Sequence, residues 1–275
     1  MTQAELTSQI KDYVRGLGST LVGVANAERL AAAPRGHRPE DFLPGARSVV
    51  VMAMPILRAY ARYPEFMKDS PLVPERVEKK PGRMSYWVHT FNPRLAIANH
   101  VYRRAAYEAL NMELQRQTIH LATHLEEIGH DAIAMPTAYG STFTWNQADP
   151  RPNLMGPFSL RHAAVAAGLG RFGMNNLVVT RRYGPLQRFA AVITTAEMDP
   201  HPLEQDDICP GEECSICKDT CPNQCFAGIE EYEFAGLKAR MWAMNRSICG
   251  DYQSSNLSGC TQECLFKCPL GLKRR

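Results

Sequence analysis

Apolar residues in the first 200 positions recur partly at helical spacing and partly as continuous runs, which predicts a mixed α/β region. Thr2 and Glu5 fit a capping box at the start of one helix. The run 48–54 is continuously apolar and suits a buried strand. The whole pattern predicts helices at 2–15, 93–128 and 159–167, and strands at 21–25, 48–54, 131–135, 176–180 and 189–195.

Three stretches show neither apolar residues at helical spacing nor a continuous apolar run, and we expect them to be loops. These are 34–44, the proline-containing excursion 60–85, and 136–157. A loop as long as the last one is usually functional. A turn at Tyr183-Gly184-Pro185 separates the last two predicted strands, so we expect them to pair as a hairpin.

Composition narrows the class of protein. The net charge is +3, from 31 basic and 28 acidic side chains, and this balance gives no sign of a nucleic-acid partner. The chain has no apolar run long enough for a membrane span and does not begin like a signal peptide. We therefore expect a soluble, cytoplasmic protein that binds neither membrane nor nucleic acid.

Cysteine distribution is the most informative feature of the chain. All nine cysteines lie between Cys209 and Cys268. Thiols gathered in one part of a chain without a secretory signal favour metal ligation over a disulfide framework. We therefore expect two domains, an α/β domain at 1–200 and a small metal-binding domain at 201–275.

The spacing of the cysteines resembles a two-cluster ferredoxin. Both groups end in Cys-Pro, as in runs of the type C-x2-C-x2-C-x3-C-P, whose fourth cysteine ligates the other cluster. The resulting sets for two [4Fe–4S] clusters are Cys209, Cys214, Cys217 and Cys268, and Cys221, Cys249, Cys260 and Cys264. Cys225 belongs to neither set and could replace Cys249 as a ligand. Zinc is the alternative, although it does not account for the Cys-Pro endings.

The segment Gly168-Leu-Gly170-Arg-Phe-Gly173 matches G-x-G-x-x-G. A dinucleotide-binding fingerprint needs a strand before it and a helix after it, whereas the predicted order here is the reverse. No acidic residue follows at the usual distance. The glycines indicate either a helix C-cap with a tight turn or a backbone cradle for a bulky cofactor.

Four segments together resemble the cobalamin-dependent reductase family that contains reductive dehalogenases and epoxyqueuosine reductase. They are Phe42-Leu-Pro-Gly-Ala-Arg-Ser-Val-Val, the segment from Ala167 to Thr180, the segment from Tyr183 to Thr195, and the double cysteine motif. They follow one another in the order found in the family, and the resemblance runs from about 17 to 269.

The resemblance implies a nitroreductase-like α/β domain that holds base-off cobalamin, followed by a ferredoxin-like domain with two [4Fe–4S] clusters. Electrons would come from an external low-potential donor, a ferredoxin or flavodoxin, and reduce a small organic substrate. The resemblance places the cofactor beside two segments, at Gly168, Leu169, Gly170, Arg171, Phe172, Gly173 and Asn175, and at Tyr183 and Gly184.

The chain also departs from the family pattern. The catalytic aspartate of epoxyqueuosine reductase aligns with Leu154, which argues against epoxide reduction on tRNA. The C-terminal repeat domain of that enzyme and the twin-arginine leader of respiratory dehalogenases are not expected here.

Reductive cleavage also needs a proton, and a tyrosine beside a cation is a suitable donor. The candidate catalytic residues are Tyr86, Tyr139, Arg161 and His162. We thus expect an oxidoreductase. The alternatives are a non-catalytic electron carrier or corrinoid-handling protein, and the same fold with a flavin or an empty pocket.

Overall fold

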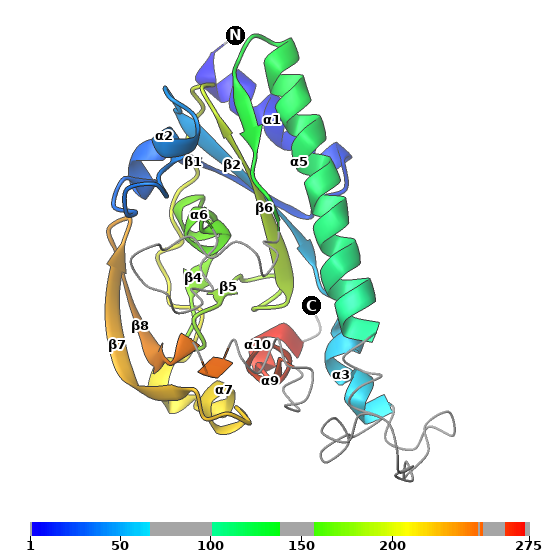
Figure 1. Cartoon of the computed structure of the whole chain (residues 1–275), viewed down its shortest axis with the longest axis vertical. Coiled ribbons are helices and arrows are strands. Elements are labelled where there is room, and N and C mark those ends of the chain that lie inside the picture. Colours follow the sequence, from blue (N-terminus) through cyan, green and yellow to red (C-terminus); the bar gives the residue numbers. More distant parts are fainter. Residues whose placement is uncertain (1, 67–100, 138–156, 247, 250–261, 273–275) are drawn as a thin grey trace, which may run out of the picture.

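The computed structural model describes residues 2–66, 101–137, 157–246, 248–249 and 262–272, and shows a mixed α/β arrangement (Figure 1). Its centre is an antiparallel four-stranded sheet with the order β1-β2-β6-β3. The strands are β1 (Leu21–Asn26), β2 (Ser48–Pro55), β3 (Ala132–Ala134) and β6 (Gln187–Thr194). The mixed α/β prediction is confirmed.

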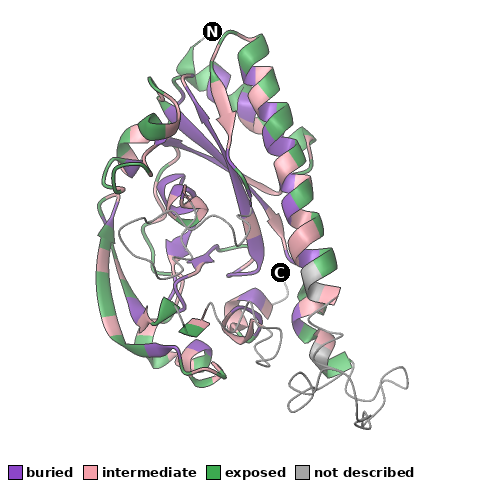
Figure 2. Ribbon diagram, in the orientation of Figure 1, coloured by how far each residue is buried: buried purple, intermediate pink, exposed green. Residues whose placement is uncertain are grey.

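Helices cover both faces of this sheet. One face packs against α1 (Gln3–Gly16) and α5 (Ala109–Glu127) through buried residues such as Ile10, Leu121 and Val192. The other face packs against the short helix α6 (Leu160–Ala166), whose small residues allow a close approach. Strand β2 is buried along most of its length because both faces are covered, which explains its continuous apolar run (Figure 2).

Several short elements complete the described part of the first 200 residues. They are η1 (Ala27–Leu30), α2 (Pro39–Phe42), α3 (Arg58–Phe66), the π-helical segment η3 (Tyr102–Glu108) that leads into α5, β4 (Arg171–Phe172) and β5 (Val178–Val179). The Thr2 capping box is present, with the Glu5 N–H donating to Thr2 Oγ1 at 3.2 Å. Within the described residues no helix is long and apolar enough to cross a membrane.

Three local predictions are wrong. Within the predicted loop 34–44, Pro39–Phe42 forms the short helix α2. The predicted hairpin between 176–180 and 189–195 does not form, because β5 pairs with β4 whereas β6 joins the large sheet between β2 and β3. The sequence shows strand character but not the partner of each strand. The start of the excursion predicted at 60–85 is helical in α3. The start of the long helix predicted at 93 lies outside the described residues.

The cysteine-containing part consists of short helices and one long hairpin. The elements are η4 (Gly211–Glu213), α7 (Ile216–Asp219), β7 (Phe226–Phe234), β8 (Leu237–Met244), α9 (Glu263–Phe266) and α10 (Pro269–Leu272). The hairpin β7–β8 occupies the interval between the two cysteine groups, and Phe234 and Leu237 at its tip join the core beside α6. The hairpin therefore joins the cysteine region to the α/β region (Figure 1).

Candidate functional site

Four cysteines from both ends of the cysteine region line one hollow. They are Cys209, Cys214, Cys217 and Cys268. The first three lie around η4 and α7, and the fourth immediately precedes α10, so the chain returns from a distant point to complete the set. This is the set that the crossover rule of two-cluster ferredoxins gives. Met174 and Asn175 of the glycine segment line the same hollow.

Burial favours the protonated form of two of these thiols. It raises the pKa of Cys217 to about 11, and it raises the pKa of Cys268 as well. Within the described residues, no three His, Cys, Asp or Glu side chains meet closely enough to hold a single metal ion. The four thiols therefore surround a space rather than converge on one point.

A second group of thiols lies beside the first. Cys221 and Cys225 are 3.4 Å apart between their sulfur atoms. Burial is the main cause that raises the pKa of Cys225. Negative charge on Cys221, Cys249 or Cys264 raises it further, because these thiols lie close by. Cys225 is thus part of the second group, and so is Cys249, which leaves both available as ligands. Cys260 lies outside the described residues.

The glycine segment follows α6 and precedes β5, which is the order that a dinucleotide fingerprint does not have. Gly168 has a φ of +69° and ends the helix. A Cβ there would lie 2.1 Å from Pro202 O, and one at Gly170 would lie 2.2 Å from Val179 O. Protein backbone fills the space beside both glycines. Their role in this structure is close packing of the chain, with no open cradle on those sides.

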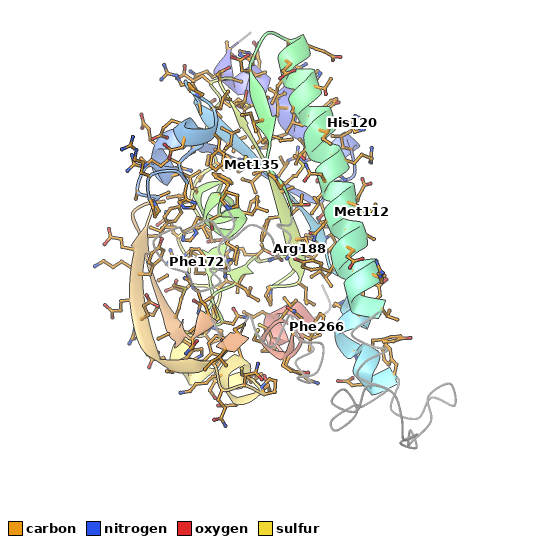
Figure 3. The ribbon with its side chains drawn as sticks, in the orientation of Figure 1. Met112, His120, Met135, Phe172, Arg188 and Phe266 are labelled. Atoms are coloured by element: carbon orange, nitrogen blue, oxygen red, sulfur yellow. The ribbon has the colours of Figure 1, made fainter. Side chains whose placement is uncertain are left out.

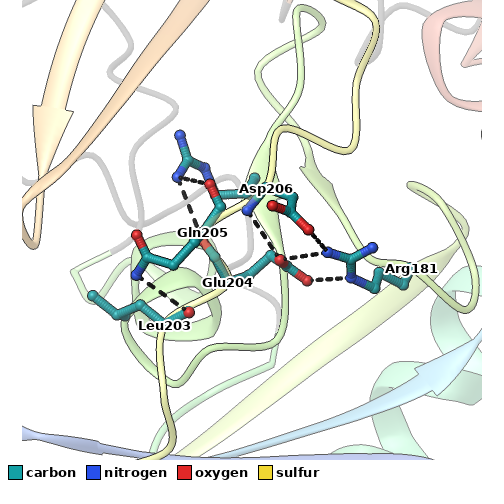
Figure 4. A network of polar contacts seen from close by, with 6 residues as sticks. Arg181, Leu203, Glu204, Gln205 and Asp206 are labelled. Atoms are coloured by element: carbon teal, nitrogen blue, oxygen red, sulfur yellow. Dashed lines mark hydrogen bonds and ion pairs between the residues drawn. The ribbon is translucent and has the colours of Figure 1, made fainter.

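Arg171 in this segment ties the two regions together. Its buried guanidinium donates to Lys238 O of β8 at 2.5 Å and pairs with Asp207 at 2.9 Å. Arg181, further along, holds Glu204 and Asp206 in the connection that leads to the cysteines (Figure 4). Both arginines fix the position of the cysteine region against the α/β region.

Asn175 and the turn at Gly184 make two more contacts with the cysteine region. Asn175 Nδ2 donates to Cys264 O at 2.8 Å. Gly184, with a φ of +56°, has α10 so near that a Cβ would lie 2.5 Å from the Gly271 nitrogen. The half-buried Tyr183 contacts the Arg182 guanidinium, whose carbon is 5.2 Å from the ring centre. Leu169 packs partly buried beside Gly23 of β1.

His162 stands in a hydrogen-bonded chain between two hydroxyls. Its Nδ1 is 2.6 Å from Ser159 Oγ, and its Nε2 is 2.9 Å from the Tyr232 hydroxyl of β7. Rings of Phe172 and Phe234 contact the imidazole edge to face. Burial, followed by the charges of Arg161 and Arg246, lowers the pKa of His162 to about 4. The neutral imidazole can therefore accept a hydrogen bond from one hydroxyl and donate one to the other.

Arg161 lies next to this chain and remains open to solvent on one side. Its Nη1 donates to Asn176 O at 2.6 Å, and burial lowers its pKa although part of the residue is exposed. These two facts together place Arg161 in a recess. The charges of Arg188 and Arg246 also act on it. Arg188 lies between β6 and α5, where its Nε donates to Asn111 Oδ1 at 2.9 Å (Figure 3).

Tyr86 and Tyr139, the other two candidate catalytic residues, lie outside the described residues, as does Leu154.

Comparisons with known proteins point to one family. The chain is 32% identical over 117 residues to tetrachloroethene reductive dehalogenases of Desulfitobacterium hafniense and Dehalobacter restrictus. This match covers 38% of the chain and only 21% of those relatives. No family model matches the sequence.

Over these 117 residues the chain is similar to reductive dehalogenases. Solved structures show the same fold. A catabolic reductive dehalogenase superposes with a TM-score of 0.61 at 16% identity, over 99% of this chain and 32% of that one. Epoxyqueuosine reductase from Streptococcus thermophilus superposes with a TM-score of 0.55 at 17% identity, over 98% of this chain and 67% of that one.

Sequence reasoning missed two features of this site. Tyr232, which contacts His162, and Trp242, which packs against Cys217, both come from the hairpin between the cysteine groups. The alternation of charged and apolar residues at 226–244 could have indicated the hairpin. No sequence signal indicates that its inner side chains face His162 and the thiols.

Proposed function

We propose that the chain is a cobalamin-dependent iron–sulfur reductase. Residues 201–275 form a ferredoxin-like domain with two [4Fe–4S] clusters, and residues 1–200 form a nitroreductase-like domain for a base-off corrinoid and a small organic substrate. The clusters transfer electrons one at a time from an external low-potential donor. The proposal makes the chain an oxidoreductase of the reductive dehalogenase kind.

The observation that carries this proposal is the hollow lined by Cys209, Cys214, Cys217 and Cys268. It joins three cysteines of the first group to the last cysteine of the second, as a cluster with crossover ligation requires. The second group of thiols supports a second cluster with Cys221 and Cys264, and with Cys225 or Cys249 beside the predicted Cys260. Buried thiols suit this role because ligation replaces each proton by iron.

The proposal that a corrinoid binds rests more on the similarity to reductive dehalogenases than on any cavity among the described residues. A structural neighbour with a TM-score of 0.55 and 15% identity is described as a reductive dehalogenase with B12-dependent dehalogenation. When bound, the cobalt would supply the electrons that cleave a bond of the substrate. Protein atoms fill the space beside Gly168 and Gly170, so we assign the glycine segment to supporting the site and holding the cysteine region beside it.

Proton supply is the role that we propose for His162 and Tyr232. Replacing a halogen by hydrogen on carbon consumes two electrons and one proton and releases halide. If Ser159 donates to Nδ1, the imidazole Nε2–H donates to the Tyr232 oxygen, and the Tyr232 proton is then available to another acceptor. Arg161, in its recess beside them, would stabilise a phenolate or an anionic group of the substrate.

A small organic substrate is preferred to tRNA. One epoxyqueuosine reductase neighbour, at a TM-score of 0.54, was solved with a tRNA stem loop. The aspartate that epoxide reduction uses in that family aligns with Leu154 here. Addition of an epoxyqueuosine-containing stem loop to the protein, followed by nucleoside analysis, would distinguish the two substrate classes.

The first experiment is metal analysis of protein purified without oxygen from cells supplied with cobalamin. We expect about eight irons per chain, one cobalt, and electron paramagnetic resonance signals of two reduced clusters. Iron without cobalt, and without binding of added cobalamin, would contradict the corrinoid part and favour an electron carrier or a flavin. Zinc in place of iron would contradict the whole proposal.

A further inference from the structure

The indole of Trp242 stands beside a thiol of the first group. Trp242 and Cys217 belong to one buried cluster, and both side chains are almost fully inaccessible to solvent. Trp242 Nε1 is buried and, within the described residues, has no ordinary hydrogen-bond partner. A buried N–H without an acceptor costs about 1–3 kcal/mol, so such a group in a folded protein calls for an explanation.

The polar group that lies beside this N–H is the thiol of Cys217. Burial raises the pKa of Cys217, while a hydrogen bond from the Trp242 side chain acts in the opposite direction and favours the thiolate. A thiol sulfur is only a weak acceptor, and the indole N–H forms no well-aligned hydrogen bond to it here. A thiolate is a stronger acceptor because the bond becomes charge-assisted. A thiolate that ligates a cluster would therefore offer the buried, unpartnered indole N–H a stronger acceptor than a free thiol does.

The position of Trp242 is fixed from two sides. Its backbone N–H donates to Met174 O at 3.0 Å, and its carbonyl accepts from Asn176 Nδ2 at 2.9 Å. Both partners belong to the segment that follows Gly173. A bulge opposite Trp242, between Ala227 and Ile229, interrupts the hairpin register. Bulges re-aim side chains, and here both Met241 and Trp242 are buried, against the alternation of a regular strand.

A cation lies on the outer face of the same ring. Lys218 Nζ is 4.6 Å from the centre of the Trp242 ring. Its charge draws electron density toward the ring face, which makes the indole N–H a better donor. Lys218 directly follows Cys217 in α7, so cation, ring and thiol form one compact arrangement.

We propose that Trp242 donates an Nε1–H···Sγ hydrogen bond to Cys217 as a cluster ligand and thereby raises the reduction potential of the first cluster relative to the second. This proposal rests on the proposed function, because it needs an iron–sulfur cluster at Cys217. Reduction adds one electron to the cluster and makes or breaks no covalent bond. The added charge spreads onto the thiolates, so a donor to sulfur stabilises the reduced state more than the oxidised one. Trp242 is therefore a positioning and tuning residue that touches no substrate.

The test is Trp242→Phe in the full chain, with both cluster potentials measured by redox titration under electron paramagnetic resonance. The variant keeps an aromatic ring and removes only the donor. We expect the reduction potential of one cluster to become more negative by up to about 59 mV. For a one-electron couple this shift is a tenfold change in the reduction equilibrium. The second potential should stay within error of the wild type. Equal potentials in variant and wild type would overturn the proposal.

A matched control separates the hydrogen bond from packing. Phe226 is buried in the same cluster and its ring has no polar hydrogen, so Phe226→Leu disturbs the packing without removing a donor. We expect this control to leave both potentials close to the wild-type values. A shift as large as that of Trp242→Phe would assign the effect to packing or water access and would contradict the hydrogen bond.

A second measurement needs no variant. Electron–nuclear double resonance of the reduced wild-type protein should show a proton coupled to the first cluster that is lost after exchange into D2O. Its absence would overturn the proposal even if Trp242→Phe failed to fold. Wild-type protein without iron would instead contradict the proposed function, so the two failures are distinguishable.

Discussion

The sheet and the cysteine region are stabilised in different ways. Around the sheet, fully buried aliphatic residues such as Val50, Leu121 and Ile193 pack on regular elements, so burial of apolar area stabilises the protein without any ligand. Around the cysteines, six thiols share the interior with a few apolar side chains such as Phe226 and Trp242. These residues are carried on short helices and a largely exposed hairpin (Figure 2). Thiols contribute little as hydrophobic groups but much as metal ligands. Under the proposed function, a bound cluster would therefore stabilise only the second region.

Removing a thiol should show this difference most strongly. We expect Cys268→Ala to lose about four of about eight irons, because the remaining thiols of the first hollow cannot hold a cluster. The sheet should stay folded, since α1, α5 and α6 do not depend on the cluster. Iron analysis and far-ultraviolet circular dichroism check both parts. Full iron content in the variant would contradict the assigned ligand set.

Truncation in the sheet core gives the opposite result. Leu121 on α5 is fully buried against β2 and β6. We expect Leu121→Ala to lower the free energy of unfolding by about 3 kcal/mol while iron content per folded chain is unchanged. Denaturant unfolding and iron analysis measure the two quantities. Exposed Met112 on the same helix supplies the control, because Met112→Ala should change stability by less than about 0.5 kcal/mol.

Between the two regions, His162 should make stability depend on pH. Its pKa is lowered in the folded protein to about 4, from 6.5 when unfolded. The unfolded chain therefore binds the proton more tightly, and stability falls as pH decreases from 6.5 toward 4. We expect a loss of about 1–2 kcal/mol between pH 7 and pH 5, after allowance for partial solvent access.

The matched variant for this effect is His162→Gln, which keeps hydrogen-bonding capacity but does not titrate. Thermal unfolding of both proteins at pH 5, 6 and 7 gives the comparison. An identical pH dependence would show that protonation of other groups causes the loss, and it would remove the basis for a neutral imidazole between Ser159 and Tyr232.

Much of this protein follows from its sequence alone. The continuous apolar run at 48–54 determined a strand buried on both faces, because no solvent-exposed strand tolerates such a run. The Thr2 capping box determined where α1 begins. The cysteine spacing, through the crossover rule, determined which four thiols share the first hollow, since the rule links positions far apart in the chain.

Only the tertiary structure decided the rest. Strand partners are long-range choices that local patterns do not contain, and so β5 pairs with β4 and not with β6. The glycine segment looked like a cofactor loop, but Gly168 and Gly170 approach backbone from Pro202 and Val179, which no spacing rule predicts. Tyr232 and Trp242 reach His162 and Cys217 only because the hairpin folds back across the α/β region, a placement that depends on packing across the whole molecule.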